Sequence, residues 1–352
     1  MSELQKILIT AIENNASDVH IMVNSRPLLR IHTALVEADF PIITPDSALA
    51  LVREMLTEDR FNEFLEKRDL DFSAEVPDKG RFRVNAHFQR GTAAIAFRTI
   101  KDDVPDIAGL NLPDAVSQLT NLARGLVLVT GDTGSGKSTT MASMVNSINN
   151  RYNRHIITLE DPVEYVLTSN KCAIEQREIG TDCLSFASGL KHALRQDPDV
   201  ILVGEMRDLE TTASAITAAE TGHLVLSTLH TMSASQTIER IIDIYPTGQQ
   251  NQVRSMLANT LQAVISMTLF KRIDFSGMIP GVEILLCTPA VRNCIRENRI
   301  FEIPNIIETS RGIGMQTMDY CIAQLFMNGH ISKEDALASA ANPEKLNRAL
   351  CA

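Results

Sequence analysis

Leu126-Val-Leu-Val-Thr130 runs directly into Gly131-Asp-Thr-Gly-Ser-Gly-Lys-Ser-Thr139, so a glycine-rich loop follows an apolar run. The second stretch fits the pattern G-x-x-x-x-G-K-[ST], in which a strand leads into a phosphate loop and the loop opens a helix. Its glycines let successive N–H groups point inward at a phosphate, and the N-terminus of the helix favours the same anion. The pattern therefore predicts a nucleoside triphosphate site, with a helix over residues 139–148.

The residues of this loop have distinct expected roles. Lys137 reaches the β- and γ-phosphate oxygens, and the hydroxyl of Ser138 is a ligand for Mg²⁺. The expected substrate is ATP and the expected cofactor is Mg²⁺. The predicted nucleotide-binding residues are Thr133, Gly134, Ser135, Gly136, Lys137, Ser138 and Thr139.

The composition suits an enzyme with a sizeable core. The chain has 352 residues, of which 44% are hydrophobic, and this length predicts two or three domains. No run of about 18 apolar residues and no charged-then-apolar leader is seen, so we expect a cytoplasmic protein. The net charge of −10, with no Trp, argues against a broad nucleic-acid surface. The six cysteines form no C-x-x-C pair, which favours reduced, packed thiols over a zinc site.

The first hundred residues indicate a separate small α+β unit. Apolar positions at helical spacing predict a helix over residues 4–12, and Thr44 and Pro45 predict the start of a second helix that runs to about residue 57. Residues 19–23, 81–89 and 93–99 are the expected strands, and the second of these alternates polar and apolar side chains. The expected linker is residues 101–113, which contain Pro105, Gly109 and Pro113. The predicted domains are thus 1–100 and 114–352, with C-terminal helices from about residue 290.

Polar side chains follow four apolar runs of the second domain, where ligands of open α/β sheets bind. The runs end in the phosphate loop, in Glu160-Asp-Pro-Val-Glu164, in Gly204-Glu205 and in His230. Glu205 fits the position of a carboxylate near Mg²⁺, and Glu164 is the expected group that polarises the attacking water. Glu160 or Asp161 are alternatives for that role. His230 is the expected sensor of the γ-phosphate.

Two further groups of residues have a weaker claim on this site. His223 precedes the last strand, about 20 Å from its other end at ~3.3 Å per residue, so a packed or interface histidine is the better reading. Arg81 and Arg83 share one face of their strand, and Arg98 lies on the next strand. A solvated sheet face is the usual explanation for such arginines.

These motifs resemble those of the secretion-type traffic ATPases, and within them the PilT-like ATPases that retract type IV pili. The resemblance rests on the phosphate loop, Glu160 to Glu164, Val203-Gly-Glu-Met-Arg-Asp208, Thr221 to His230, Gly314-Met-Gln-Thr-Met-Asp319 and two motifs of the first domain, Asp18-Val-His20 and Arg81 to Asn85. Ala290-Val-Arg-Asn-Cys-Ile-Arg-Glu297 is similar to the signature helix of the retraction ATPases; there the matching polar residues are Arg292, Asn293, Arg296 and Glu297. Asp132 departs from the family, which usually has Pro.

The resemblance implies a PAS-like N-terminal domain joined to a RecA-like ATPase domain, assembled as a homohexamer. It implies that Arg81, Arg83 and Arg98 reach a bound nucleotide, and that His223 and His230 belong to one histidine motif. It also implies ATP-driven pilus retraction through an inner-membrane platform protein, with peripheral attachment to that membrane.

Three other functions stay open on the sequence. One is a pilus-extension or type II secretion ATPase, which generally carries a longer N-terminal region and a four-cysteine insertion that are not seen here. The second is a PilU-type accessory ring member that acts with a paralogous motor. The third is a nucleic-acid motor, which the acidic charge opposes; no nucleic-acid partner is expected.

Overall fold

The chain forms two compact units. The computed structural model describes residues 1–32, 34–77, 79–100 and 104–350. One unit comprises Met1–Asp103 with Pro162–Val166, and the other comprises Val104–Asp161 with Leu167–Ala352. The start of the expected linker, residues 101–103, lies outside the described residues. From Val104 onward the expected linker belongs to the second unit, where it holds the short 3₁₀ helix Ala108–Leu110.

The first unit is a six-stranded antiparallel sheet with three helices. The strand order is β3-β2-β1-β6-β5-β4, and every neighbouring pair is antiparallel. The strands are β1 (Asp18–Ile21), β2 (Leu28–Ile31), β3 (Ala34–Glu37), β4 (Asp69–Val76), β5 (Gly80–Gln89) and β6 (Thr92–Ile100), and the helices are α1 (Glu3–Glu13), α2 (Pro45–Met55) and α3 (Glu58–Lys67).

The local signals of this unit produce most of these elements. Leu4, Ile7, Leu8 and Ala11 are the buried side of α1, as their helical spacing predicts. The Thr44 hydroxyl accepts the N–H of Ser47 and caps α2. The prediction for this helix was wrong at its end, because α2 stops at Met55 and Thr57 caps a further helix, α3. The first strand also ends at Ile21, two residues before its predicted end.

The second unit is built on a seven-stranded sheet of mixed direction. Its order is β13-β12-β7-β11-β10-β8-β9, and all neighbours are parallel except β12 and β13. The strands are β7 (Gly125–Thr130), β8 (His155–Glu160), β9 (Ala173–Glu178), β10 (Val200–Val203), β11 (Leu224–Leu229), β12 (Leu261–Lys271) and β13 (Met278–Leu286). The central strands β7, β10 and β11 are buried along their whole length, which is typical of parallel strands covered on both faces.

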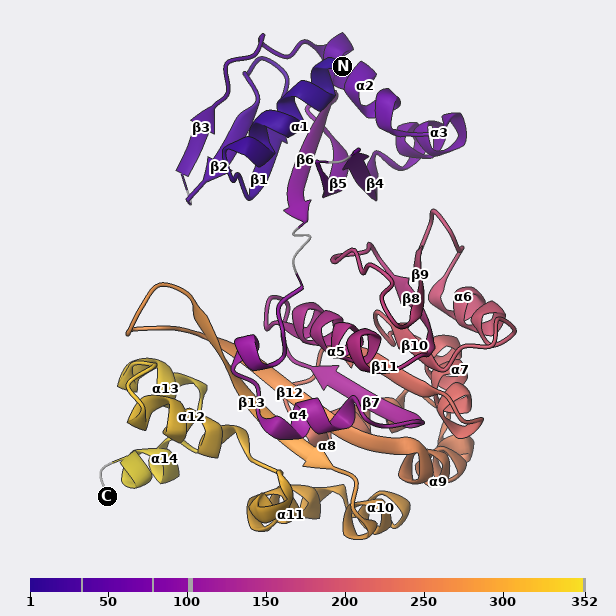
Figure 1. Cartoon of the computed structure of the whole chain (residues 1–352), viewed down its shortest axis with the longest axis vertical. Coiled ribbons are helices and arrows are strands. Elements are labelled where there is room, and N and C mark those ends of the chain that lie inside the picture. The colour runs from indigo at the N-terminus through magenta and orange to yellow at the C-terminus, as the bar shows by residue number, and fades with distance from the viewer. Residues whose placement is uncertain (33, 78, 101–103, 351–352) are drawn as a thin grey trace. The chain divides into compact units, whose positions relative to one another are not determined.

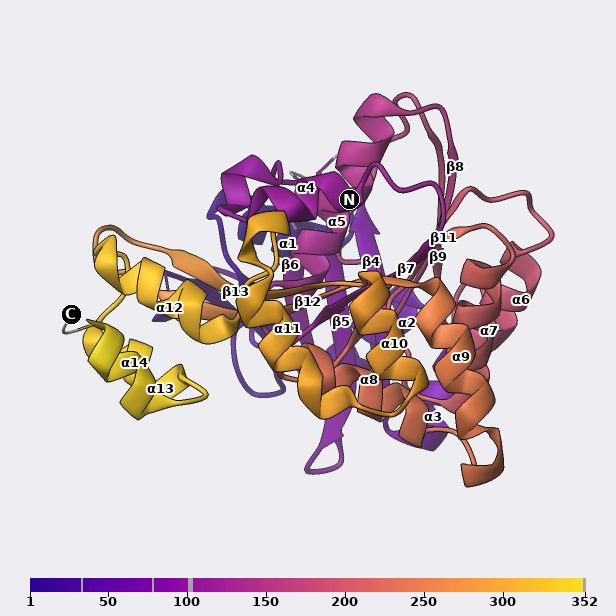
Figure 2. The same cartoon turned by 90° about the horizontal axis from the view of Figure 1, so that it is seen from below.

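Helices cover both faces of this sheet (Figure 1). Leu126 and Leu128 of β7 pack into one core with the helices α6 to α11, and Val127 and Val129 pack into the other with α4 and α5. Figure 2 shows α9, α10 and α11 side by side on their face of the sheet. The bounds are α4 (Asp114–Leu119), α5 (Lys137–Arg151), α6 (Phe186–Ala193), α7 (Leu209–Glu220), α8 (Ala234–Asp243), α9 (Gln250–Thr260), α10 (Pro289–Arg296) and α11 (Ile303–Thr309).

The C-terminal part is helical, as predicted. Three short helices, α12 (Met318–Met327), α13 (Lys333–Ser339) and α14 (Pro343–Leu350), form a small core of their own with Phe270 and Ile279 of the β12–β13 hairpin. Within the described ranges, no helix is both long enough and apolar enough to cross a membrane. The five cysteines that the structure describes are free thiols. The α/β class predicted from the sequence is confirmed.

Candidate nucleotide-binding site

The four predicted strand ends lie at one edge of the second sheet. The strands β7, β11, β10 and β8 are consecutive neighbours and all parallel, so their carboxyl ends point the same way. The phosphate loop follows β7, His230 follows β11, Glu205 comes shortly after β10, and Glu160 ends β8. One edge of one sheet therefore carries an anion-binding loop, two carboxylates and a histidine.

The phosphate loop has a backbone that requires glycine at three positions, one of which is Gly134 with φ of +80°. Gly131 has φ of +137°, and a Cβ there would lie 2.2 Å from the carbonyl oxygen of Met267 on β12. Gly136 has φ of +95° and is the residue before α5, which has no side-chain cap. The uncapped N-terminus leaves its positive end for an anion. The helix itself begins at Lys137 and is longer than predicted.

Lys137 is held inside the loop. Its Nζ donates to the carbonyl oxygens of Gly131 and Asp132, both at 2.8 Å, and only 8% of the residue is exposed. Thr133, Gly134 and Ser138 are exposed on the same loop, whereas the Ser135 hydroxyl is buried and has no hydrogen-bond partner among the described residues. The loop thus presents one cation and an exposed hydroxyl, Ser138, at its helix end.

Glu205 and His230 form the centre of the carboxylate side of the site. Oε1 of Glu205 lies 3.4 Å from Nε2 of His230, and Oε2 lies 2.8 Å from the guanidinium of Arg207. The Glu205 side chain is 17% exposed and that of Arg207 is 73% exposed. The hydrogen bond to Glu205 raises the pKa of Arg207. The sequence analysis gave Arg207 no role, although its place two residues after Glu205 beyond a strand end was a usable signal.

Glu160 is oriented by one side chain of its own strand and one of the neighbouring strand. Its Oε1 accepts a hydrogen bond from the Thr158 hydroxyl at 2.6 Å and one from the Gln176 amide at 3.1 Å. Gln176 lies on β9, the edge strand next to β8. These bonds fix the carboxylate at the strand end.

Two kinds of predicted residue belong to the first unit. Glu164 belongs to the five-residue segment Pro162–Val166 that groups with that unit. Arg83 and Arg98 are register partners on β5 and β6, and Nε of Arg98 donates to Asp18 at 3.0 Å while 71% of its side chain is exposed. Arg81 donates to the Ser73 hydroxyl at 2.7 Å. The three arginines lie on one polar sheet face, and their role toward a nucleotide stays a prediction.

His223 lies at the opposite end of β11 from His230. Its Nδ1 is 2.9 Å from the carbonyl oxygen of Ala218, in the last turn of α7, and its own carbonyl accepts the N–H of Gly125 at the start of β7. Both contacts are at the amino edge of the sheet. The two histidines are therefore separated by the length of the strand.

One arginine of the helix α10 forms hydrogen bonds with a neighbouring helix. The Arg292 guanidinium donates to the carbonyl oxygens of Ala258 and Asn259, at 2.5 and 2.9 Å, and so closes the C-terminus of α9. Asn293, Arg296 and Glu297 are exposed. Arg292 is therefore held by the end of α9, which lies beside it.

The donors at this edge fit a magnesium nucleotide. Mg²⁺ with a nucleotide is usually bound through one or two protein oxygens, the phosphates and water. The exposed Ser138 hydroxyl and the partly exposed Glu205 carboxylate are oxygen donors of that kind. The described residues contain no group of three or more His, Cys, Asp or Glu that could hold a metal ion.

Comparisons with known proteins identify the family of this chain. The chain is 44% identical to the type IV pilus retraction ATPase PilT of Pseudomonas aeruginosa, over 97% of this chain and 99% of that protein. It is 36% identical to the type IV pilus ATPase PilU of the same organism, over 96% and 88% of the two chains. A crystal structure of the pilus retraction motor PilT with bound ADP superposes with a TM-score of 0.91 at 43% identity, covering 99% of this chain and all of that one. The family model for type II/IV secretion system proteins matches residues 1–303. The chain therefore belongs to the type II/IV secretion system protein family, as a PilT-like member with an N-terminal domain followed by a RecA-like ATPase domain.

Proposed function

We propose that this chain is a Mg²⁺-dependent ATPase that powers the retraction of type IV pili. The observation that carries the proposal is the pairing of an intact phosphate loop with the Glu205–His230 contact on neighbouring strand ends, in a chain that matches PilT along nearly its whole length. The match to PilT exceeds the match to PilU, 44% against 36%.

The chemistry follows from the groups at the sheet edge. Lys137 exchanges its two loop carbonyls for phosphate oxygens, and the N-terminus of α5 adds its partial positive charge. Mg²⁺, held by Ser138 and Glu205, would neutralise charge on the phosphates. His230 lies beside Glu205, where it can donate to an oxygen of the terminal phosphate. A carboxylate, Glu164 in our assignment, orients the attacking water.

The working form in this proposal is a homohexameric ring. Phosphoryl transfer needs cations at the developing charge, and Arg83 and Arg98 are the candidate groups of the first unit. If a neighbouring subunit supplies them, isolated chains turn over slowly and assembled rings turn over fast. The ring would act at the inner face of the cytoplasmic membrane on a platform protein, and domain motion during turnover would withdraw pilin subunits.

A complementation experiment tests this function. Cells that lack their own retraction ATPase receive the wild-type chain, the Lys137→Ala variant or an Arg26→Ala control, which loses only an exposed ion pair with Asp39. We expect retraction, seen by microscopy of labelled pili, with the wild type and the control and none with Lys137→Ala. Retraction that requires a second ATPase of the host would favour the accessory role, and pilus growth in a strain without its extension ATPase would favour the extension role.

A further inference from the structure

A row of polar residues crosses the second sheet from the phosphate loop to β13. Thr130, the last residue of β7, is the register partner of Ser266 on β12, and Ser266 is the register partner of Glu283 on β13. Thr130 and Ser266 are fully buried, and the Thr130 hydroxyl donates to that of Ser266 at 2.9 Å. Residues paired directly across strands lie on the same sheet face. Glu283 is thus in line with the residue that precedes the phosphate loop.

Glu283 also contacts the first residue of α8. Its Oε1 accepts the backbone N–H of Ala234, the first residue of α8, at 2.8 Å. Burial raises the pKa of Glu283, and nearby backbone N–H groups, that of Ala234 first, partly offset that rise. Helix N-termini favour a carboxylate because their N–H groups are unpaired within the helix.

The helix α8 is joined directly to the nucleotide site. Residues 230–233 connect the end of β11 with α8, and the first of them is His230. At one end of this segment His230 contacts Glu205, and at the other end Ala234 is bonded to Glu283. The carboxylate of Glu283 therefore fixes the far end of the segment that carries His230.

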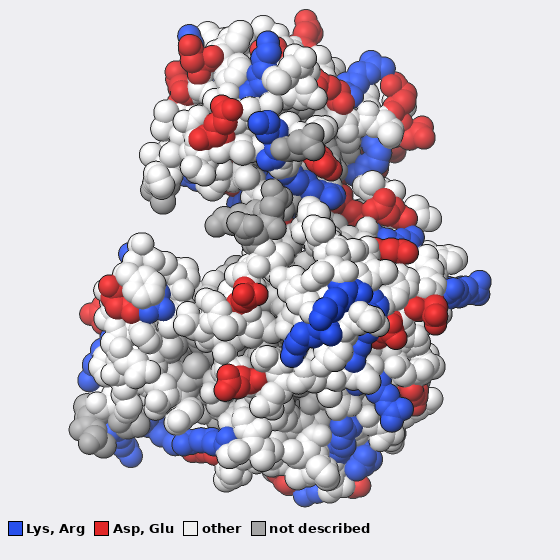
Figure 3. Space-filling view, in the orientation of Figure 1, with Lys and Arg blue, Asp and Glu red and all other residues white. Residues whose placement is uncertain are grey.

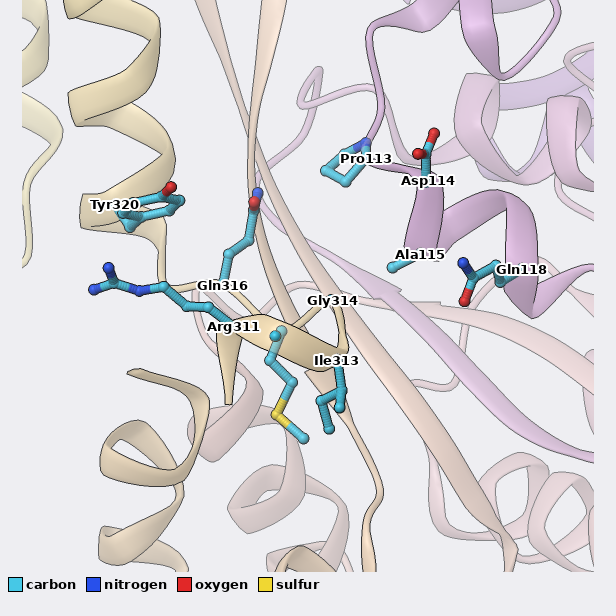
Figure 4. Close-up of a pocket in the computed structure, with 11 residues that line it drawn as sticks. Pro113, Asp114, Ala115, Gln118, Arg311, Ile313, Gly314, Gln316 and Tyr320 are labelled. Carbon is cyan, nitrogen blue, oxygen red and sulfur yellow. The ribbon is translucent and has the colours of Figure 1, made fainter. Parts of the chain in front are cut away.

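The start of α12 is attached to the same part of β13. The Gln316 amide donates to the carbonyl oxygen of Val282 at 2.7 Å, and Gln316 and Ile284 form a β-bridge. On its other side, the loop before α12 borders a cavity of about 520 Å³ shared with the start of α4. Figure 4 shows Arg311 and Tyr320 on one side of this space and Asp114 and Gln118 on the other. The loop has room for a small displacement.

We propose that Glu283 is a positioning residue that couples the nucleotide site to the C-terminal helices, because it ties the His230 segment to the stretch of β13 that also holds Gln316, just before α12. The inference rests on the proposed function, in which this site hydrolyses ATP. A change in the His230 segment on nucleotide binding then moves the first turn of α12. Without Glu283, a change in that segment no longer reaches α12. Glu283 acts through His230 and does not contact the nucleotide.

The test compares Glu283→Ala with a matched control at the same two helices. Ser233 caps α8 and Thr317 caps α12 with their own hydroxyls, so Ser233→Ala combined with Thr317→Ala weakens both helix starts and leaves the Glu283 carboxylate. Steady-state kinetics give kcat and KM, and amide hydrogen exchange of α12 is measured with and without Mg-ADP. In the wild type we expect ADP to change exchange in the first turn of α12.

We expect Glu283→Ala to abolish that response and to lower kcat about tenfold at nearly constant KM, and the double control to keep both. Glu283→Gln, whose amide has a single acceptor oxygen, should give an intermediate response. It also serves as the test if Glu283→Ala does not fold. A control that loses the response equally, a Glu283 variant that keeps it, or a wild type without any ADP response would overturn the inference. A wild type that shows the response but hydrolyses no ATP would leave the coupling intact and refute the proposed function.

Discussion

Oε1 of Glu205 and Nε2 of His230 lie 3.4 Å apart, across the neighbouring ends of β10 and β11. The two residues are 25 positions apart in the sequence, and only the parallel pairing of their strands brings them together. The contact places a carboxylate and an imidazole on the edge that carries the phosphate loop. These two side chains are the ones to which the proposed reaction assigns the metal-binding and phosphate-sensing roles.

We predict that Glu205→Gln and His230→Ala each lower kcat for ATP by about 100-fold while nucleotide binding is kept. The lost groups act on charge that develops in the reaction, whereas Lys137 and the loop amides provide most of the binding. The measurement is steady-state kinetics together with a binding isotherm for a labelled nucleotide. Arg26→Ala, which removes only an exposed ion pair with Asp39, is the control and should keep wild-type kcat.

Glu164→Gln is expected to bind ATP and to hydrolyse it far more slowly, since an amide cannot accept a proton from water. Single-turnover experiments separate the two steps. Wild-type turnover in this variant would move the role to Glu160, whose carboxylate already accepts two hydrogen bonds, or to Glu205.

Arg98→Ala should assemble normally yet hydrolyse ATP slowly, if its guanidinium completes the site of a neighbouring subunit. Arg26→Ala provides the comparison, because Arg26 also pairs with an aspartate, Asp39, on the same unit. Light scattering reports the assembly and phosphate release reports the rate. Rings of Arg98→Ala with wild-type turnover would return Arg98 to a solvated sheet face.

The helix α10 offers a pair of arginines with different expected effects. Arg292→Ala removes charged hydrogen bonds from the end of α9 and should lower the free energy of unfolding by about 1–2 kcal/mol. Arg296→Ala lies on the exposed side and should leave stability within about 0.5 kcal/mol. If this helix serves retraction, Arg296→Ala keeps ATPase activity and loses pilus retraction in cells. Full retraction by that variant would remove Arg296 from the mechanism.

Asp274 gives a prediction about pH and stability. The guanidinium of Arg272, followed by the ring of His330, holds the pKa of Asp274 well below its usual range. A lowered carboxyl pKa stabilises the fold above the ordinary aspartate pKa of about 3.9 and ceases to do so as the pH falls. Asp274→Asn should therefore have a lower urea midpoint than the wild type at pH 7, and the gap should shrink below about pH 4.

The control for Asp274 is Asp39→Asn, which removes an exposed ion pair with Arg26. It should shift the midpoint little at any pH. A gap between Asp274→Asn and the wild type that stays constant down to pH 3 would show that the ion pair is not its cause.

The sequence predicted those parts of the molecule that have strong local signals. The phosphate loop and the alternating strand over residues 81–89 are read from consecutive residues, and both are present as β7, α5 and β5. The strand β3 escaped notice because all four of its residues are exposed and it has no buried face to give a pattern. The helix α3 buries only Phe61 and Phe64, too few apolar residues to mark a helix.

The missing parts of the site depend on pairing between distant segments. Arg292 looks like any charged residue of an amphipathic helix until the C-terminus of α9 is placed beside it. Glu283 lies in an apolar strand, and its contact with α8 follows from the register of β13 with β12 and from the path of the chain to α8. Strand order and register are properties of the whole sheet, so no local stretch encodes them.

The central claim is that the chain is an ATPase completed by assembly, and the most direct test is turnover measured against assembly. Phosphate release from Mg-ATP is followed over a range of protein concentrations, with particle mass recorded on the same samples. We predict that turnover per subunit rises as hexamers replace monomers and that Lys137→Ala hexamers are inactive. Hexamers of the wild-type chain that bind ATP without hydrolysing it would contradict the claim.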